Sequence, residues 1–503
     1  MEAIFDMGPA EPCPAPFNLA EHVLGHGHAP EDKIALAVVG PSRAERWSYA
    51  RLMAAVRGVG TGLLEQGFAP GDIVLMRIGN QPEFPIAYLG AIAAGLVPVP
   101  TSPQLTESEV AAMIADLAPA TILHAPDVPC PDAACSVIDT QTMRGWYALP
   151  PVDWHRGDPN RLAYIVYTSG TSGTPRAVAH AHRAIWARRM MVTGWYGLGP
   201  DDRLLHAGAF NWTFTLGTGL LDPWSVGATA LIPAAGVEHA QIPLLLRRHE
   251  ASLFAAAPGV YRSILKHHDK LDLPRLRHGL AAGEKLAGPI REAWRHATGT
   301  EVYEAFGMSE CSTFISSAPD SPADPDALGR PQPGRRVAIL GENRPVSIGD
   351  EGEIAIHRSD PGLMLGYRGA EQETAARFRG DWFVTGDKGR MDAEFQVFYL
   401  GRADDMMNAG GYRVSPIEVE AALLAHPGID EAGVTDVEIK PGVSIIAAFW
   451  AGPEALSDTD LAAWCETRLA RYKQPRHFQR LEALPKNANG KLVRKELKAQ
   501  ISL

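Results

Sequence analysis

The sequence predicts an α/β protein with a large N-terminal domain, residues 1–402, and a small α+β C-terminal domain, residues 403–503. Helix-like and strand-like patterns alternate through residues 1–150, as they do in layered α/β domains. Around residues 401–411, paired glycines next to clustered charges precede a new helix-like segment, which is typical of a domain boundary. The length of 503 residues is sufficient for two or more domains.

The first elements follow from hydrophobic periodicity. Residues 49–66 have the apolar spacing of an amphipathic helix, and residues 72–77 form an apolar run with the length of a strand. A second helix is expected at residues 83–96, and residues 95–100 are expected to form an apolar turn after it. These elements build a layered α/β subdomain and show no chemistry beyond structure.

Composition and charge narrow the class of protein. Apolar residues make up 46% and charged residues 21%, as in an ordinary globular protein, and the net charge of −11 argues against general binding to nucleic acids or anionic membranes. The five cysteines form no Cys-x-x-Cys pair and are odd in number, which indicates a reducing compartment and no structural zinc. The chain begins without a signal-peptide pattern, and its longest apolar run, residues 88–100, is too short to span a bilayer. We therefore expect a cytoplasmic protein.

A loop rich in glycine and hydroxyl groups is the most informative stretch. Residues 167–178 read Tyr-Thr-Ser-Gly-Thr-Ser-Gly-Thr-Pro-Arg-Ala-Val and lie between a predicted buried strand at 162–166 and a helix-compatible segment from residue 182. Glycines let the backbone approach a ligand closely, hydroxyls and free backbone N–H groups donate hydrogen bonds to phosphates, and a guanidinium matches phosphate oxygens. A flexible linker is the alternative, but linkers are not usually placed between a buried strand and further apolar sequence. The predicted phosphate-binding residues are Thr168, Ser169, Gly170, Thr171, Ser172, Gly173 and Arg176.

This loop resembles the phosphate loop of the adenylate-forming superfamily, which includes acyl-CoA synthetases, adenylation domains of peptide synthetases and luciferases. The usual pattern is Tyr/Phe-Thr-Ser-Gly-Thr-Thr-Gly-x-Pro-Lys-Gly-Val, from which this chain departs at Arg176 and Ala177. Four further family motifs follow in the family order, and the resemblance covers residues 47–497. It is strongest to the benzoate–CoA ligase and medium-chain acyl-CoA synthetase groups. It implies a large domain of layered α/β subdomains plus a small β-barrel, with a mobile C-terminal cap.

The resemblance implies roles for residues that would hold the nucleotide. Residues 303–310 read Tyr-Glu-Ala-Phe-Gly-Met-Ser-Glu. The last five of them match the family pattern Tyr-Gly-x-Thr-Glu, with Phe306 in place of Tyr and Ser309 in place of Thr. Phe306 would pack on adenine, the hydroxyl of Ser309 would bond the α-phosphate, and Glu310 would hold Mg²⁺, which prefers oxygen ligands. Asp387, in Thr-Gly-Asp, would accept hydrogen bonds from the ribose, and Arg402 would contact the ribose or a phosphate.

The same resemblance implies an acyl pocket. Taken alone, the alternating aromatic residues at 210–214 fit a core strand, but in acyl-CoA synthetases this stretch forms one wall of the pocket. No aspartate occurs at 210–214, which disfavours an amino-acid substrate. Gly307 replaces a bulky aromatic of acetate-specific members and implies a deeper pocket. The predicted pocket residues are Phe210, Asn211, Trp212, Ala282, Gly283, Gly307 and Met308.

The C-terminal segment supplies the remaining implied residues. Asp404 would be the hinge of the cap, and Gly410, Gly411 and Tyr412 would form its coenzyme A face. The segment 484–494 resembles the Pro-x-x-x-x-Gly-Lys loop that places a lysine, here Lys491, in the active site. A cation suits this place because attack of a carboxylate on ATP brings two anions together. Such a group contributes roughly 3–4 kcal/mol in comparable electrostatic sites.

These observations predict an ATP-dependent acyl-CoA synthetase that activates an apolar carboxylate, aromatic or of medium chain length. Its expected cofactors are ATP, Mg²⁺ and coenzyme A. We expect small-molecule partners only, with no nucleic acid or membrane, and a monomer or homodimer. Two alternatives stay open. The acyl group could pass to a carrier protein or an amine, or the protein could be a non-catalytic nucleotide-binding relative.

Overall fold

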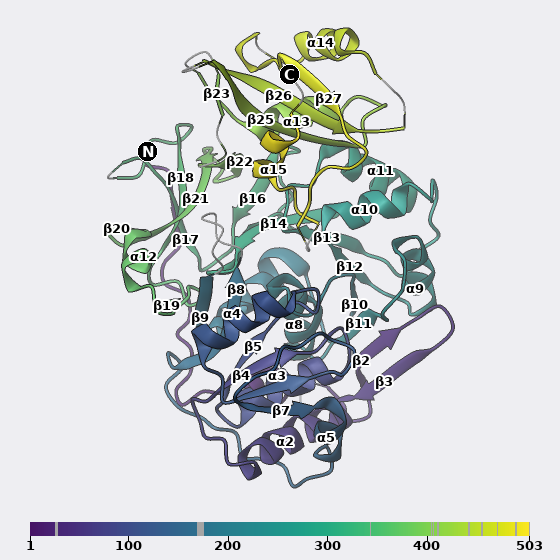
Figure 1. Cartoon of the computed structure of the whole chain (residues 1–503), viewed down its shortest axis with the longest axis vertical. Helices are drawn as coiled ribbons and strands as arrows, with labels where there is room; N and C mark the ends of the chain where they lie inside the picture. The colour runs from purple at the N-terminus through teal and green to yellow at the C-terminus, as the bar shows by residue number, and fades with distance from the viewer. Residues whose placement is uncertain are drawn as a thin grey trace.

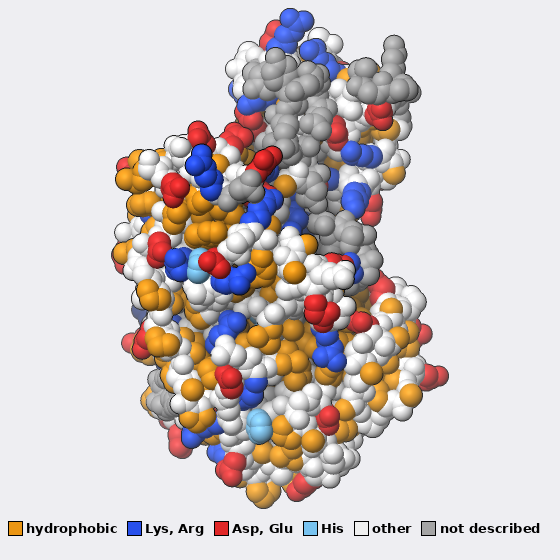
Figure 2. Space-filling view, turned by 90° about the vertical axis from the view of Figure 1, so that its left-hand side faces the viewer, with side chains coloured by type: hydrophobic (Ala, Val, Ile, Leu, Met, Phe, Trp, Pro, Cys, Tyr) orange, Lys and Arg blue, Asp and Glu red, His pale blue; other side chains and the backbone are white. Residues whose placement is uncertain are grey.

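The chain consists of a large N-terminal body and a narrower C-terminal part. The computed structural model describes all residues except 26–28, 169–175, 343, 404, 406, 410–411, 441–442, 454–455, 470, 488–489 and 502–503. Figure 1 shows the C-terminal part above the body, and Figure 2 shows the same arrangement from the side. No helix in these described ranges is both long enough and apolar enough for a bilayer. All five cysteines are free.

Among the described residues, a mixed sheet of 15 strands forms the centre of the body. Its middle is parallel, as expected for an α/β domain, and the carboxyl ends of its strands face the C-terminal part (Figure 1). The strands of this half, in spatial order, are β14 (Val302–Met308), β13 (His278–Ala282), β12 (Leu253–Ala256), β10 (Arg203–His206), β11 (Thr229–Pro233), β2 (Ile34–Val39) and β3 (Ala44–Ser48). The helices between them include α8 (Asp222–Ser225), α9 (Ile242–Arg248), α10 (Pro258–Leu265) and α11 (Gly288–Thr298).

Antiparallel strands continue this sheet on its other side. In spatial order they are β15 (Ser312–Ser316), β16 (Ala327–Pro331), β22 (Val397–Arg402), β21 (Trp382–Met391), β18 (Glu351–His357), β17 (Arg336–Leu340) and β1 (Ile4–Asp6), with β20 (Phe378–Arg379) on β21. The family resemblance implies a small β-barrel here. Among the described residues these strands pair antiparallel and join the central sheet through β15 and β16.

A four-stranded parallel sheet forms the lower layer of Figure 1. Its order is β5 (Val97–Pro100), β4 (Ile73–Arg77), β6 (Thr121–His124) and β7 (Ser136–Asp139), with α2 (Tyr49–Glu65), α3 (Glu83–Ala93), α4 (Glu107–Leu117) and α5 (Thr140–Gly145) around it. The two helices and the strand predicted between residues 49 and 96 are confirmed. The predicted turn at 95–100 is wrong in part, because Val97–Pro100 pairs with β4 as a buried edge strand, where proline is tolerated.

The glycine-rich stretch connects two antiparallel strands. These are β8 (Leu162–Thr168) and β9 (Arg176–Ala181), and β19 (Gly366–Tyr367) pairs with β9. Sequence patterns predicted a strand, a loop from residue 167 to 178, and then a helix-compatible segment. The loop is shorter than predicted, because residues 167–168 and 176–178 belong to the strands and Thr168 pairs with Arg176. Short helices follow at α6 (Arg183–Ala187) and α7 (Arg189–Met191).

The C-terminal part has its own sheet and its own core. Strands β25 (Glu431–Lys440) and β26 (Val443–Ala451) are antiparallel, and β27 (His477–Arg480) lies parallel to β26. The other elements are the hairpin β23 (Met407–Ala409) and β24 (Tyr412–Val414), and the helices α13 (Pro416–Leu424), α14 (Asp458–Glu466) and α15 (Arg494–Ala499). Buried side chains from α13, α14 and these strands pack together in one cluster, and Leu497 of α15 packs in a second cluster with Ala447 and Phe449 of β26. This is the predicted α+β architecture; the boundary at residues 402 and 403 stays a prediction.

Candidate active site

A cavity of about 1640 Å³ lies between the body and the C-terminal part. The carboxyl ends of β13 and β14 reach it from the body, since parallel strands present these ends at one edge of a sheet. The antiparallel strands β21 and β22 line it as well. The segment 484–494 reaches it from the other side. The predicted site residues that line it are Thr168, Arg176, Trp212, Ala282, Gly283, Phe306, Gly307, Met308, Ser309, Glu310, Asp387, Arg402 and Lys491.

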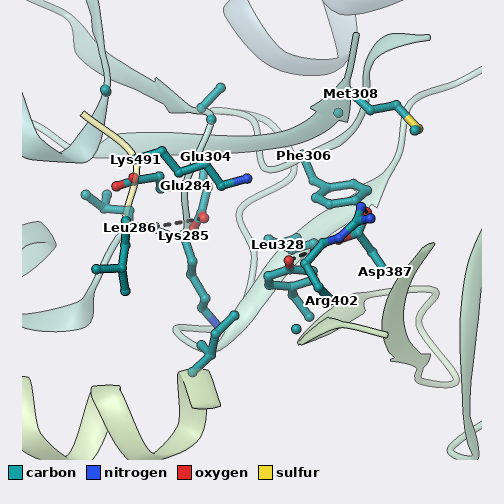
Figure 3. Close-up of a pocket in the computed structure, with 18 of the residues that line it drawn as sticks. Glu284, Lys285, Leu286, Glu304, Phe306, Met308, Leu328, Asp387, Arg402 and Lys491 are labelled. Carbon is teal, nitrogen blue, oxygen red and sulfur yellow. Dashed lines mark hydrogen bonds and ion pairs between the residues drawn. The ribbon is translucent and has the colours of Figure 1, made fainter. Parts of the chain in front are cut away.

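An aromatic ring and an ion pair lie side by side at one end of the cavity. Asp387 on β21 is paired in register with Arg402 on β22, whose Nη1 donates to Oδ2 at 3.4 Å, and the hydroxyl of Tyr399 donates to Oδ1 at 3.0 Å. Burial raises the pKa of the Asp387 carboxyl above its usual value, and the Arg402 cation opposes the rise. The ring of Phe306 lies 5.6 Å from that of Tyr399, and Figure 3 shows it beside Asp387 and Arg402. A flat apolar face next to charged hydrogen-bonding groups fits an adenosine.

Ser309 and Glu310 follow β14 at the centre of the cavity. The carbonyl of Ser309 accepts a hydrogen bond from His180 Nε2 at 2.7 Å, and Glu310 Oε1 accepts one from the hydroxyl of Tyr367 at 2.6 Å. Glu310 is 8% exposed, and its Oε2 has no hydrogen bond within the described part of the chain. The described residues contain no cluster of three or more His, Cys, Asp or Glu side chains that could hold a metal. A single carboxylate oxygen fits Mg²⁺, which substrate phosphates and water usually hold together with one or two carboxylates.

Lys491 enters the cavity from the C-terminal part. Its loop is closed by a bridge between Lys486 and Leu492, and the Lys491 N–H donates to Asn487 Oδ1 at 3.0 Å. Figure 3 shows the side chain reaching into the cavity beside Glu284. Burial raises the pKa of Glu284, and among the neighbouring charges Lys491 opposes this rise most strongly. The same charge acts on Asp387, so the ammonium group lies in the field of two carboxylates, of which Glu284 is half-buried and Asp387 is buried.

Arg176 already has a carboxylate partner. Its Nε and Nη2 donate to the two carboxylate oxygens of Glu373, each at 2.6 Å. Glu373 belongs to the helix α12 (Glu371–Ala376) at the rim of the cavity. This two-pronged geometry is also the one by which a guanidinium holds a phosphate. Arg176 would have to exchange Glu373 for a phosphate in order to fill its predicted role.

Several predicted residues lie outside the described part of the chain. In the phosphate loop these are Ser169, Gly170, Thr171, Ser172 and Gly173. In the hinge and the coenzyme A face these are Asp404, Gly410 and Gly411, together with the side chain of Tyr412. Their roles stay predictions.

Of the residues predicted at 210–212, Trp212 lines the cavity and its two neighbours do not. The Trp212 ring packs on Gly283, where φ is +96° and a Cβ would lie 2.7 Å from the ring. Phe210 is 0% exposed and packs against Phe84 in the core of the body, with ring centroids 5.5 Å apart. Asn211 is likewise absent from the cavity wall among the described residues. Phe210 and Asn211 differ from the prediction because the backbone turns here: the Trp212 N–H donates to the carbonyl of residue 209 at 3.0 Å. Side chains in this turn do not alternate as they do in a strand.

Gly307 does not deepen the pocket, contrary to the prediction. A Cβ at this position would lie 2.1 Å from the carbonyl oxygen of Ser312 and 2.4 Å from Thr313 Cα. The glycine is therefore required by the close approach of β15, whose register with β14 shifts between Phe306 and Gly307. Its missing side chain faces backbone and adds no space for a substrate.

Sequence reasoning missed the buried carboxylate of Glu304 on the cavity wall. Glu304 Oε1 accepts from the Leu286 N–H at 3.0 Å (Figure 3), and Oε2 accepts from Arg291 Nη2 at 3.1 Å. Burial raises its pKa to about 7, against the opposing charge of Arg291. A glutamate between apolar neighbours in a buried strand was the signal that could have identified it. Other cavity residues absent from the predicted set include Thr213, Glu284, Ser312, Tyr367 and Tyr399.

Glu304→Gln is expected to change the pH dependence of stability. The folded-state pKa of about 7 lies above the ordinary value of 4.5, so the stability that protonated Glu304 contributes is complete below pH 4.5 and is lost as the pH rises through 7. The neutral glutamine removes this loss. In urea denaturation from pH 5 to pH 8, the variant should therefore gain stability relative to the parent as the pH rises. A constant difference across this range would show that Glu304 does not titrate there.

Comparison with known proteins identifies the family. The family model for AMP-binding enzymes matches residues 26–368, and the model for their C-terminal domain matches residues 418–491. The benzoate–CoA ligase of Thauera aromatica is 31% identical over 91% of each chain, and the mitochondrial acyl-coenzyme A synthetase ACSM3 of Homo sapiens is 28% identical over 96% of this chain and 90% of its own. The structure of a benzoate CoA ligase from Burkholderia xenovorans LB400 matches with a TM-score of 0.85 and 25% identity, over 96% of this chain and 100% of that chain. The resemblance carried by the motifs is confirmed: this chain belongs to the AMP-binding enzyme family.

Proposed function

We propose that this protein is an AMP-forming carboxylate–CoA ligase that uses one cavity for two successive reactions. The observation that carries the proposal is the meeting of Phe306, Glu310, Asp387, Arg402 and Lys491 around one cavity between the two parts of the chain. Family membership supports the same reaction, because the chain matches the AMP-binding enzyme model over most of its length. The named relatives that cover almost the whole chain are CoA ligases.

In the first reaction, a carboxylate oxygen of the substrate attacks the α-phosphorus of ATP, and the bond to pyrophosphate breaks. Phe306 packs on the adenine, and Asp387 and Arg402 hold the ribose. Lys491 stabilises the negative charge that develops between carboxylate and phosphate. Glu310 would hold Mg²⁺, which when bound neutralises phosphate charge.

In the second reaction, the C-terminal part rotates about Asp404. Lys491 withdraws, and the face formed by residues 410–412 approaches the adenylate. The coenzyme A thiolate attacks the acyl carbon, the bond from that carbon to the AMP oxygen breaks, and acyl-CoA and AMP leave. One cavity can serve both reactions only through such a conformational step.

The proposed substrate is an apolar carboxylate, aromatic or of medium chain length. The indole of Trp212, packed on Gly283, and the side chain of Met308 provide apolar wall in the cavity. The relatives named benzoate–CoA ligase and acyl-coenzyme A synthetase support this substrate class. Turnover of acetate alone would contradict it. Cytoplasmic location and a monomeric or homodimeric state remain predictions from the sequence.

A panel of acids tests the proposal. Pyrophosphate release from MgATP would be measured with acetate, butyrate, octanoate, benzoate, phenylacetate and several amino acids, each with and without coenzyme A. We expect release with benzoate or octanoate, and AMP release that is accelerated by coenzyme A. Acceleration by an acyl-carrier protein or an amine instead would favour the first alternative. Absence of pyrophosphate release with every acid would favour a non-catalytic nucleotide-binding protein.

A further inference from the structure

A second, much smaller cavity adjoins the large one. Its volume of about 30 Å³ holds one or two non-hydrogen atoms. It shares Thr213, Ser309 and Ser312 with the large cavity, so these three residues line both spaces. We call it the inner pocket; its polar lining also includes Tyr88, Tyr164, His180 and Arg188.

Two buried groups of the inner pocket have unused hydrogen-bonding capacity. The Tyr88 hydroxyl and His180 Nδ1 have no hydrogen-bond partner in the described part of the chain, although Tyr88 is 0% and His180 3% exposed. His180 Nε2 lies 2.7 Å from the Ser309 carbonyl and therefore donates, which leaves Nδ1 as an acceptor. Burial lowers the pKa of His180 to about 4 and raises that of Tyr88 well above its usual value, so both are neutral near pH 7.

The charge of the inner pocket is already balanced. Arg188 donates from Nε and Nη2 to the two carboxylate oxygens of Asp222, at 2.7 and 2.6 Å, and from Nη1 to the hydroxyl of Ser312. Both partners of this ion pair are buried. A further anion would leave the buried group of charges with a net negative charge, which is costly in a low-dielectric interior. A small neutral group suits the pocket better.

We propose that the inner pocket receives a hydroxyl substituent of the acyl group, so that the preferred substrate is a hydroxylated carboxylate. A hydroxyl both accepts and donates, which matches the unused donor of Tyr88 and the unused acceptor of His180. A substrate without this substituent offers these two buried polar groups no partner of its own, and a site built in this way discriminates against the analogue without the hydroxyl. The inference rests on the proposed CoA ligase function and makes its substrate class narrower.

The test compares matched acids on the same enzyme. For pyrophosphate release, kcat/KM would be measured with benzoate, its three monohydroxy isomers, 3-methylbenzoate and isophthalate, and with butyrate and 3-hydroxybutyrate. At least one hydroxylated acid should exceed its unsubstituted partner by roughly 10-fold or more. Equal or lower values for every hydroxylated acid, or a preference for isophthalate, would overturn the inference.

The variant Tyr88→Phe should lower this hydroxyl preference by roughly 10-fold. The ratio compares two acids on one preparation, so partial misfolding does not alter it. Tyr147→Phe is the matched control, because the Tyr147 hydroxyl is also buried without a partner among the described residues but lies on neither cavity. An unchanged ratio in Tyr88→Phe would overturn the inference while leaving the ligase function intact. Absence of turnover with every acid would overturn the proposed function, and the inference with it.

Discussion

Lys491→Ala is expected to lower the rate of adenylate formation by roughly 10²–10³-fold, while the reaction of synthetic acyl-adenylate with coenzyme A continues. Lys491 is the cation that the C-terminal part brings into the cavity beside Glu284. In the first reaction it stabilises charge between two anions, the carboxylate and the α-phosphate. In the second it has withdrawn, so its removal affects only the first.

The measurement separates the two reactions on one protein. Pyrophosphate release reports the first, and thioester formation from synthetic acyl-adenylate reports the second. Lys486→Ala is the matched control: it removes the same charge from the same loop, but Lys486 is paired with Glu431 at 2.6 Å. Its effect on pyrophosphate release should stay within about 3-fold, since an exposed ion pair contributes little. Equal loss of both reactions in Lys491→Ala would contradict the role given to this residue.

Arg188→Met is expected to destabilise the N-terminal body by about 3–5 kcal/mol, because it leaves the carboxylate of Asp222 buried without its charge partner. Asp222 is 2% exposed and accepts from Arg188 at 2.6 and 2.7 Å, with a further bond from Tyr196 at 2.7 Å. Removing both partners together removes the unpaired charge. The double variant Arg188→Met and Asp222→Leu should therefore be more stable than Arg188→Met alone.

Urea denaturation of the parent, both single variants and the double variant forms a double-mutant cycle. A control at the surface is Arg247→Met, whose partner Asp272 lies 3.3 Å away with both side chains exposed. This control should cost less than about 1 kcal/mol. The prediction is contradicted if Arg188→Met and Asp222→Leu each lower the free energy of unfolding by no more than the surface control and their effects add in the double variant. The ion pair would then not stabilise the wall of the inner pocket.

The elements and residues that could be predicted from the sequence are those set by local pattern or by an ordered series of motifs. The periodicity of residues 49–66 was enough for α2, and the motif order was enough to bring Lys491 and Asp387 to one cavity. Phe210 could not be placed from sequence, because a single turn at residues 209–212 directs it into the core. Gly307 was misinterpreted for a similar reason: the backbone of β15 occupies the space that its side chain would need.

The inner pocket could not be predicted at all. Tyr88, His180, Arg188 and Ser312 come from α3, β9, the segment between α6 and α7, and β15, and no motif connects them. Each is an unremarkable residue in its own segment. Only the packing of these elements shows that their polar groups meet, and that those of Tyr88 and His180 lack partners in the described chain.

The most direct test of the central claim follows an oxygen isotope. The best acid of the panel, labelled with ¹⁸O in its carboxylate, would be converted with MgATP and coenzyme A, and the nucleotide product analysed by mass spectrometry. Attack of a carboxylate oxygen on the α-phosphorus, followed by cleavage between the acyl carbon and that oxygen, leaves one labelled oxygen in AMP. We expect labelled AMP together with acyl-CoA. Unlabelled AMP, or ADP with the label in inorganic phosphate, would contradict an acyl-adenylate intermediate.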